Sequence, residues 1–136
     1  MNITEKILAR ASGQTTVSPD DVIFAKVDKV MVHDVSGPGV MKVFDKLQKQ
    51  GIDTSKLHDS SKVWIAEDHF VPSAEKVSAE NIVKLSNFSK KYDIKKHFKY
   101  GMGQYGICHT LSHEEALVNP GEVYVGGDSH TNTTGA

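Results

Sequence analysis

Hydrophobic residues recur along the chain at two spacings, one typical of amphipathic helices and the other of strands. Helical spacing predicts helices over residues 4–11, 40–50, 78–92 and 112–118. Short apolar runs predict strands over residues 22–32, 62–66, 97–100 and 122–125. Strands that alternate with helices are typical of a mainly parallel sheet covered by helices. The expected fold class is therefore α/β, a three-layer α/β/α arrangement with a mainly parallel sheet.

Polar residues and glycines mark the expected ends of these helices. Thr4 and Ser78 are predicted N-caps, because their hydroxyls can accept free backbone N–H groups. Ser112-His113-Glu114-Glu115 has the form of a capping box and predicts the start of a short helix. Gly51 is the expected stop of the helix before it. No linker or repeat divides the chain, so we expect a single α/β segment over residues 1–136.

Composition narrows the class of protein. The 136 residues are 38% hydrophobic and 24% charged, as in soluble globular proteins with a real core. A net charge of −1 gives no field that attracts nucleic acid. No apolar run approaches a membrane span, and no signal peptide is visible. The single cysteine, Cys108, suits a reducing compartment, so the expected location is cytoplasmic.

The seven histidines of the chain are not scattered evenly. Three predicted strands end in a histidine with a carboxylate beside it: His33-Asp34, Asp68-His69 and Asp128-Ser129-His130. His109 follows a glycine-rich turn. Because the carboxyl ends of parallel strands meet at one edge of a sheet, these side chains are expected to converge. Histidine–carboxylate pairs are the groups that general acid–base catalysis uses.

Three other patterns carry less weight. Residues 101–106 match the glycine fingerprint of dinucleotide sites as a string, but no helix is expected to open after them. Cys108 beside His109 is interpreted as a buried apolar residue on a strand, since neighbours there point to opposite faces. Ser129 beside His130 is not expected to form a catalytic dyad, because adjacent side chains seldom hydrogen-bond productively.

Several short motifs together resemble the aconitase and isopropylmalate-dehydratase family over most of the chain, from about residue 25 onward. The matching stretches are Met31-Val32-His33-Asp34-Val35-Ser36, Glu67-Asp68-His69-Phe70-Val71-Pro72, Gly106-Ile107-Cys108-His109, Asn119-Pro120-Gly121 and Gly127-Asp128-Ser129-His130-Thr131. Each is short, but their order and spacing are specific. The resemblance implies an aconitase-type fold, of which this α/β segment would be a part.

The resemblance also implies a reaction: removal of water from a hydroxy di- or tricarboxylate and its re-addition one carbon over. A [4Fe-4S] cluster in the complete enzyme would act as the Lewis acid. The site residues implied are Asp68, His69, His109, Asp128 and His130 for catalysis, and His33 and Ser129 for substrate binding. Asp68 and His69 would pair to protonate the leaving hydroxyl, and Asp128 would pair with His109 in the same wall of the site. His33 favours isopropylmalate- or homoaconitate-type substrates over citrate, without choosing between them.

The chain departs from the family pattern in its cysteines. The family holds its cluster with three cysteines in two stretches, and neither stretch is present. We expect no metal ligand in this chain and interpret it as the N-terminal segment of a larger catalytic subunit, truncated after Ala136. The expected partners are the missing C-terminal part and a small swivelling-domain subunit. The isolated 136 residues are predicted neither to retain a cluster nor to turn over substrate.

Two other functions stay open on the residues alone. In one, a hydrolase binds a single Zn²⁺ or Fe²⁺ through His69, His109, Asp128 and His130. In the other, a non-enzymatic α/β module binds a carboxylate or a partner subunit. Measurement of bound metal would distinguish the hydrolase from the dehydratase segment and from the non-enzymatic module.

Overall fold

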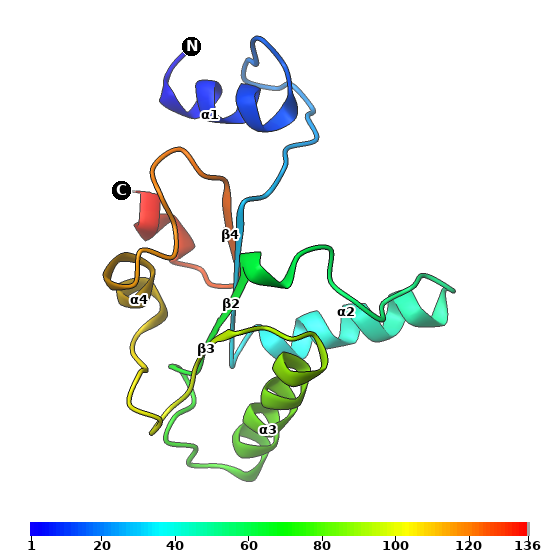
Figure 1. Ribbon diagram of the computed structural model, residues 1–136, viewed down its shortest axis with the longest axis vertical. Coiled ribbons are helices and arrows are strands. Elements are labelled where there is room, and N and C mark those ends of the chain that lie inside the picture. Colours follow the sequence, from blue (N-terminus) through cyan, green and yellow to red (C-terminus); the bar gives the residue numbers. More distant parts are fainter. Residues whose placement is uncertain (136) are drawn as a thin grey trace.

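Four parallel strands in the order β3-β2-β1-β4 form the centre of residues 1–135, the part of the chain that the computed structural model describes. Ala136, after which a truncation was expected, lies outside the described residues. The elements are α1 (Ile3–Ser12), β1 (Lys29–His33), α2 (Gly37–Lys49), η1 (Ser60–Lys62), β2 (Val63–Ala66), α3 (Lys76–Lys91), β3 (Lys96–Phe98), α4 (Cys108–Glu114), β4 (Tyr124–Gly126) and η2 (Thr131–Gly135). Figure 1 shows their arrangement.

Strand β1 lies between β2 and β4 and fixes the register of the sheet. Val32 is opposite Ile65 of β2, and Met31 is opposite Gly126 of β4. On the far side of β2, Ala66 is opposite Phe98 of β3. Because all pairs are parallel, the strands end at one edge, where the loops that follow β1, β2 and β4 lie together.

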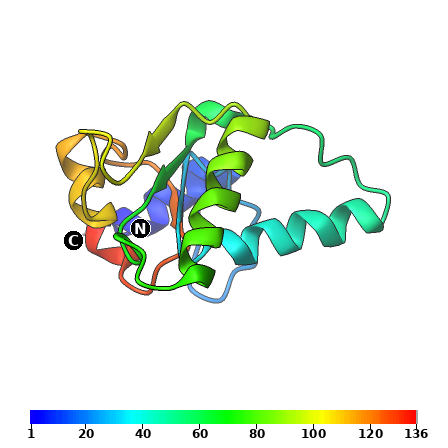
Figure 2. The same cartoon turned by 90° about the horizontal axis from the view of Figure 1, so that it is seen from below.

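Side chains that alternate along the strands build two cores, one on each face of the sheet. Val32 and Ile65 pack against Leu85 and Phe88 of α3, with Phe44 of α2 against them. On the other face, Met31 and Trp64 pack against Cys108, Leu111 and Leu117. Figure 2 shows α2 and α3 on one side of the sheet and α4 and η2 on the other. The expected three-layer α/β/α arrangement is confirmed.

Three predicted helix starts are wrong. The N-cap of α1 is Asn2 rather than Thr4: its side chain accepts the N–H of Glu5, and the Glu5 side chain accepts the N–H of Asn2. Helix α3 starts two residues before Ser78, after Glu75. Helix α2 already starts at Gly37, because the proline at its first turn is compatible with a helix start.

Among residues 1–135, no helix is long and apolar enough to cross a membrane.

The predicted capping box at residues 112–115 is also wrong. Helix α4 runs over Cys108–Glu114, so it ends where it was expected to begin. The Ser112 hydroxyl donates to the His109 carbonyl inside the helix instead of capping a new one. Leu111 and Ser112 are buried, and this burial decides the placement of the helix over the local capping pattern.

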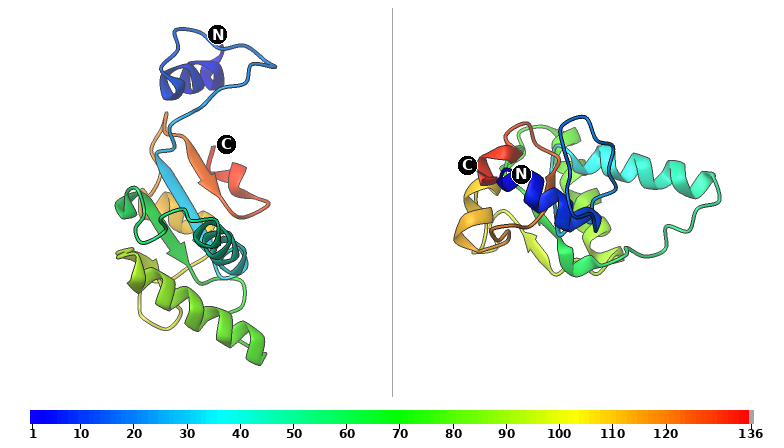
Figure 3. Two further views of the ribbon diagram at one scale, coloured as in Figure 1. Left: turned by 90° about the vertical axis from the view of Figure 1, so that its right-hand side faces the viewer. Right: turned by 90° about the horizontal axis from the view of Figure 1, so that it is seen from above.

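The strand predicted over residues 22–32 is correct only in its last part. Residues 22–28 are extended but outside the described sheet, and Val22 and Phe24 are 93% and 95% exposed. This segment leads to α1, which lies beyond the amino ends of the strands, away from the edge where the histidines gather (Figures 1 and 3).

Candidate functional site

The histidines and carboxylates expected at the strand ends do converge at the carboxyl edge of the sheet. His33 ends β1, Asp68 and His69 follow β2, and Asp128 follows β4. His109 lies in the first turn of α4, which brings it to the same edge. Residues up to 95 positions apart in sequence therefore share one cluster, as the contacts below show.

Asp128 is the centre of this cluster. Its Oδ1 lies 2.7 Å from His109 Nε2 and accepts the backbone N–H of His130 at 2.8 Å. Its Oδ2 lies 3.4 Å from His69 Nε2 and 3.5 Å from His33 Nε2. The pKa of Asp128 is below its usual value, chiefly because the His130 backbone N–H donates to it. The contact with His109 lowers the pKa further, and burial opposes the shift by a smaller amount than the His130 hydrogen bond. Asp128 is therefore an anion that faces several imidazoles.

Asp68 and His69 form a direct pair. Asp68 Oδ1 lies 2.7 Å from His69 Nδ1, and Asp68 Oδ2 accepts the Cys108 N–H at 2.7 Å. Burial alone would raise the pKa of Asp68, but the Cys108 N–H and His69 outweigh it and lower that pKa. Burial likewise opposes the charged form of His69, yet the pKa of His69 is raised by the hydrogen bond to Asp68 and by the nearby carboxylates. This pairing favours the protonated form of His69, whose ring lies between Asp68 and Asp128.

His33 has one protonation state that fits its surroundings. Its Nδ1 accepts the backbone N–H groups of Val35 and Ser36 at 3.0 and 3.1 Å. The ring proton must therefore be on Nε2, which is buried, has no hydrogen bond among the described residues and faces Asp128. Burial, together with the stacked ring of His69 at 4.4 Å, lowers the pKa of His33. His33 is a neutral hydrogen-bond donor, so it does not act as a base at Nε2.

Asp34 was part of the strand-end pattern but was not chosen as a site residue. Its buried carboxylate accepts the N–H groups of His69 and Phe70, the latter at 2.7 Å. It therefore fixes the start of the loop that carries His69. The signal in the sequence was a carboxylate directly after an apolar strand, since such a group must find hydrogen-bond donors when it is buried.

The interpretation of Ser129 and His130 needs a correction. Ser129 Oγ lies 3.0 Å from His130 Nδ1, so the two adjacent side chains do hydrogen-bond. Asp128 turns the backbone by accepting the His130 N–H, and this turn brings the neighbours together. Both side chains lie at the exposed rim, where His130 is 77% exposed.

Cys108 is buried, as expected, but on a helix rather than a strand. A helix does open after the glycine-rich residues 101–106, contrary to the prediction. The Cys108 N–H at its start donates to Asp68 Oδ2, so this N–H is not free to bind a phosphate. Burial and the neighbouring Asp68 raise the pKa of the Cys108 thiol to about 12.

A thiolate-held [4Fe-4S] cluster does not fit the residues of this chain. Such a cluster is held by several cysteine thiolates, and the sequence contains one cysteine. Cys108 is fully buried beneath the site, and its raised pKa keeps it protonated. These residues alone therefore support no chemical step through a cluster.

Two glycines allow the β4 loop to approach its neighbours closely. A Cβ on Gly127 would lie 2.5 Å from the Ser36 Cβ, and one on Gly126 would lie 2.5 Å from Thr131 Oγ1. Both distances are too short for real side chains. Gly127 is therefore required where the Asp128 loop packs against the loop after β1, and Gly126 where the end of β4 packs against Thr131.

Two groups of three side chains have ligand atoms close enough for a metal ion. One consists of His109, Asp128 and His130, and the other of His33, Asp34 and His69. The hydrolase hypothesis expected His69 to bind the same metal ion as His109, Asp128 and His130. The structure instead groups His69 with His33 and Asp34. No single group among the described residues joins the four expected ligands.

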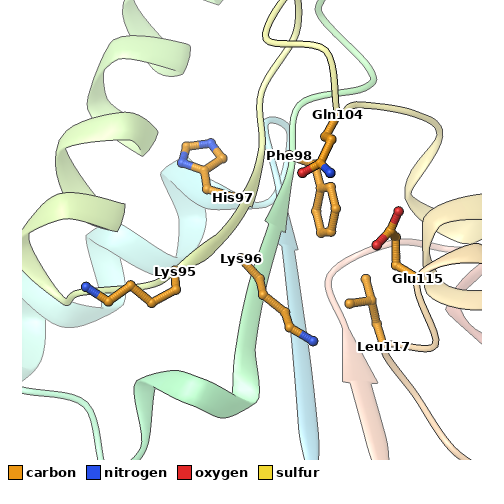
Figure 4. A pocket seen from close by; sticks show the side chains of 7 residues that line it. All are labelled: Lys95, Lys96, His97, Phe98, Gln104, Glu115 and Leu117. Carbon is orange, nitrogen blue, oxygen red and sulfur yellow. The ribbon is translucent and has the colours of Figure 1, made fainter.

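Sequence reasoning missed a further pair beside the cluster. Glu67 Oε1 lies 2.9 Å from His97 Nε2, and Glu67 Oε2 accepts the Tyr100 N–H at 3.1 Å. Both side chains are about 5% exposed or less. His97 points to the opposite side of β3 from Lys96 and Phe98, which line a hollow of about 200 Å³ (Figure 4). The signal in the sequence was a charged residue directly after the apolar run Val63–Ala66, where burial calls for a partner.

The chain is similar to members of a known enzyme family. The profile of the Aconitase family (aconitate hydratase) matches residues 5–136. The 3-isopropylmalate dehydratase large subunits of Caldicellulosiruptor saccharolyticus and Aquifex aeolicus are each 43% identical to it over 136 residues. That of Heliobacterium modesticaldum is 42% identical.

These matches cover the whole chain but only 30–31% of each relative, so the chain spans about a third of their length. The ordered strand-end motifs, the parallel sheet and the match over nearly all residues agree, and the chain belongs to the aconitase family.

Proposed function

We propose that the chain is the N-terminal segment of the large subunit of a dehydratase. The enzyme would remove water from a hydroxy di- or tricarboxylate of the 3-isopropylmalate or homoaconitate type and add it back one carbon over. Membership of the aconitase family supports this proposal, as do the relatives named as 3-isopropylmalate dehydratase large subunits. A cytoplasmic location and a small partner subunit are part of the same proposal.

The observation that carries the proposal is the position of His69. Its Nδ1 lies 2.7 Å from Asp68 Oδ1, and its Nε2 lies 3.4 Å from Asp128 Oδ2. Burial opposes the charged form of His69, but the hydrogen bond to Asp68 and the nearby carboxylates raise its pKa. The side chain is still 38% exposed, so a substrate can reach it. An imidazolium held by a carboxylate at an open edge is suited to protonate a leaving hydroxyl. We assign that role to His69, with Asp68 as its partner.

The other site residues surround this proton donor. Asp128 and His109 form the second pair of the site, and His33 presents an N–H toward it. The exposed hydroxyl of Ser129 and the ring of His130 lie at the rim. We assign Ser129 and His33 to binding of the substrate carboxylate and hydroxyl oxygens, and His130 to the water that leaves and returns.

The proposed enzyme needs a [4Fe-4S] cluster that this chain does not hold by itself. When bound, the cluster would supply the Lewis acid for the hydroxyl. Because the residues present do not fit as its ligands, the cysteines would come from outside residues 1–136. The isolated chain is accordingly predicted to have neither cluster nor activity.

The test is His69→Gln in the full-length polypeptide with its small partner. We expect the kcat for dehydration of 3-isopropylmalate to fall by about 10²–10⁴, the usual contribution of general acid catalysis. His113→Gln, at an exposed position in the last turn of α4, is the matched control and should keep full activity. An unchanged kcat in His69→Gln would contradict the assigned role.

The grouping of His109, Asp128 and His130 favours one alternative, a mononuclear metal hydrolase. Elemental analysis of the purified chain separates the two functions. One equivalent of Zn²⁺ or Fe²⁺ without sulfide would support the hydrolase, and His109→Ala should then release that metal.

A further inference from the structure

The two residues after β2 are both carboxylates, and they face opposite sides of the sheet. Glu67 contacts His97, which is opposite Ile65 in register and therefore shares the side of α3. Asp68 accepts the N–H of Cys108, which packs on the other side at the start of α4. Successive side chains of an extended segment alternate in this way. Because Asp68 pairs with the proposed proton donor, Glu67 is the next residue behind that pair.

Glu67 is tied to β3 and to the loop after it at three points. Its backbone N–H donates to the Phe98 carbonyl at 3.0 Å. Its Oε1 lies 2.9 Å from His97 Nε2, and its Oε2 accepts the Tyr100 N–H at 3.1 Å. Glu67 is 4% exposed, so water competes little for these contacts. Together they fix the backbone immediately before Asp68.

The loop that joins β3 to α4 has few other hydrogen bonds. It spans residues 99–107, and within the described chain residues 103–106 make none. Gly101 and Gly103 have φ angles of +75° and +84°, a conformation that glycine adopts readily and that adds little stiffness to the loop. The hydrogen bond from Tyr100 to Glu67 therefore holds the start of this loop to the end of β2.

Asp68 is oriented between two fixed points. One is the N–H of Cys108, a fully buried residue, which donates to Asp68 Oδ2 at 2.7 Å. The other is the backbone before Asp68, which Glu67 holds. With both points fixed, Asp68 Oδ1 lies 2.7 Å from His69 Nδ1. If the contacts of Glu67 are lost, Asp68 can turn away from His69, and a displacement of about 1 Å can cost about 10²-fold in rate.

We propose that Glu67 is a positioning residue of the enzyme, which acts on the reaction through the orientation of Asp68 toward His69. It touches no reacting atom itself. The reach of its side chain to His97 and to the Tyr100 N–H carries this role, and its negative charge does not. The inference rests on the proposed dehydratase function and adds a residue behind its acid–base pair.

Two substitutions separate the reach of the Glu67 side chain from its charge. Glu67→Gln keeps the length: its oxygen can accept the Tyr100 N–H, and its NH₂ group can donate to an unprotonated His97 Nε2. Glu67→Asp keeps the charge but is a methylene shorter, so it cannot span both contacts. Both variants are made in the full-length polypeptide with its small partner, and kcat and KM are measured with 3-isopropylmalate.

We expect Glu67→Asp to lower kcat by about 10²-fold with KM unchanged, because substrate binding is assigned to His33 and Ser129. Glu67→Gln should keep most of the wild-type kcat. Tyr92→Phe is the matched control, because it removes a buried hydrogen bond of 2.8 Å to the Thr54 carbonyl on the same side of the sheet, where α3 ends. This control should keep full kcat.

Thermal unfolding and cluster content are measured for every variant, so that kcat refers to folded enzyme with a full cluster. Equal kcat values for Glu67→Asp and Tyr92→Phe would overturn the proposal, and so would a loss in Glu67→Gln as large as that in Glu67→Asp. Losses of activity that only follow the loss of folded protein would also overturn it, because Glu67 would then support stability alone. If the wild-type enzyme with a full cluster converts no hydroxy acid, the proposed function itself is wrong, and this role of Glu67 is wrong with it.

Discussion

Asp128 Oδ1 lies 2.7 Å from His109 Nε2, a contact between the loop after β4 and the first turn of α4. The same oxygen accepts the N–H of His130, so one carboxylate both orients an imidazole and shapes its own loop. Both oxygens of Asp128 must be hydrogen-bond acceptors in this arrangement, because Oδ2 faces the Nε2 atoms of His33 and His69.

Asp128→Asn should therefore impair the site while keeping its size. An amide has no negative charge, and its NH₂ group would face N–H donors. In the complete enzyme we expect kcat/KM to fall by about 10²–10⁴, as for loss of a general acid–base group. Asp93→Asn is the control, because Asp93 is exposed and its left-handed backbone suits asparagine. Equal activity of Asp128→Asn and the control would contradict a catalytic role for Asp128.

A second prediction concerns the titration of His69. Its folded-state pKa is raised above the unfolded value, where histidine titrates near about 6.5. The pair with Asp68 therefore contributes its full stability below that unfolded value, and the contribution is lost as pH rises through the folded pKa. Histidine ring NMR should show His69 titrating above the value of a histidine in an unfolded chain.

Asp68→Asn should lower the pKa of His69, since the amide removes the charge and the acceptor at Nδ1. Asp59→Asn, beside the exposed His58, is the matched control and should leave His69 unchanged. A His69 pKa that is the same in wild type and Asp68→Asn would show that the pair does not carry the shift.

Much of the site could be predicted because it depends on a regular rule. Parallel strands end at one edge, so His33, His69 and Asp128 were expected together before any contact was known. The resemblance also implied the side-chain pairs Asp68–His69 and Asp128–His109, which the structure shows, but the backbone partners of these carboxylates could not be predicted. That Asp34 binds the backbone of His69, and that Asp68 binds the Cys108 N–H, depends on loop paths that no local pattern encodes.

Two of the errors have a common physical origin. At Ser112 a favourable local cap lost to burial of the helix, because tertiary packing outweighs capping. The start of α3 before Ser78 lies among exposed residues, and burial does not explain it. At Glu67 and His97 the missing information was strand order: the pair exists because β3 lies beside β2. Glu67 and His97 are 30 positions apart, so their contact can be expected only when the neighbouring position of β3 and β2 is known.

The Glu67–His97 pair supports a third prediction. Removing one partner of a buried, hydrogen-bonded pair leaves the other without compensation, which typically costs about 3–5 kcal/mol. Glu67→Gln should destabilise the protein less than Glu67→Ala, because the amide oxygen can still accept the Tyr100 N–H. Urea unfolding of Glu67→Ala, His97→Ala and the double variant forms a cycle that measures the coupling. Strictly additive losses would show that the two side chains do not interact.

The last prediction concerns the close approach at Gly127. A Cβ there would lie 2.5 Å from Ser36 Cβ and 2.6 Å from Ser36 Oγ, and Ser36 in turn donates its N–H to His33 Nδ1. Gly127→Ala should therefore displace Ser36, destabilise the protein by about 1–3 kcal/mol as overpacking does, and shift the NMR signals of the His33 ring.

Gly39→Ala is the matched control, because Gly39 lies in α2 and a Cβ there meets open space. Alanine at such a helical position should stabilise the protein by about 0.5–1 kcal/mol, the opposite sign. The two free energies of unfolding come from the same urea titration. If Gly127→Ala were as stable as the wild type with His33 unmoved, the loop after β4 would not depend on this contact, and Asp128 would be held by its hydrogen bonds alone.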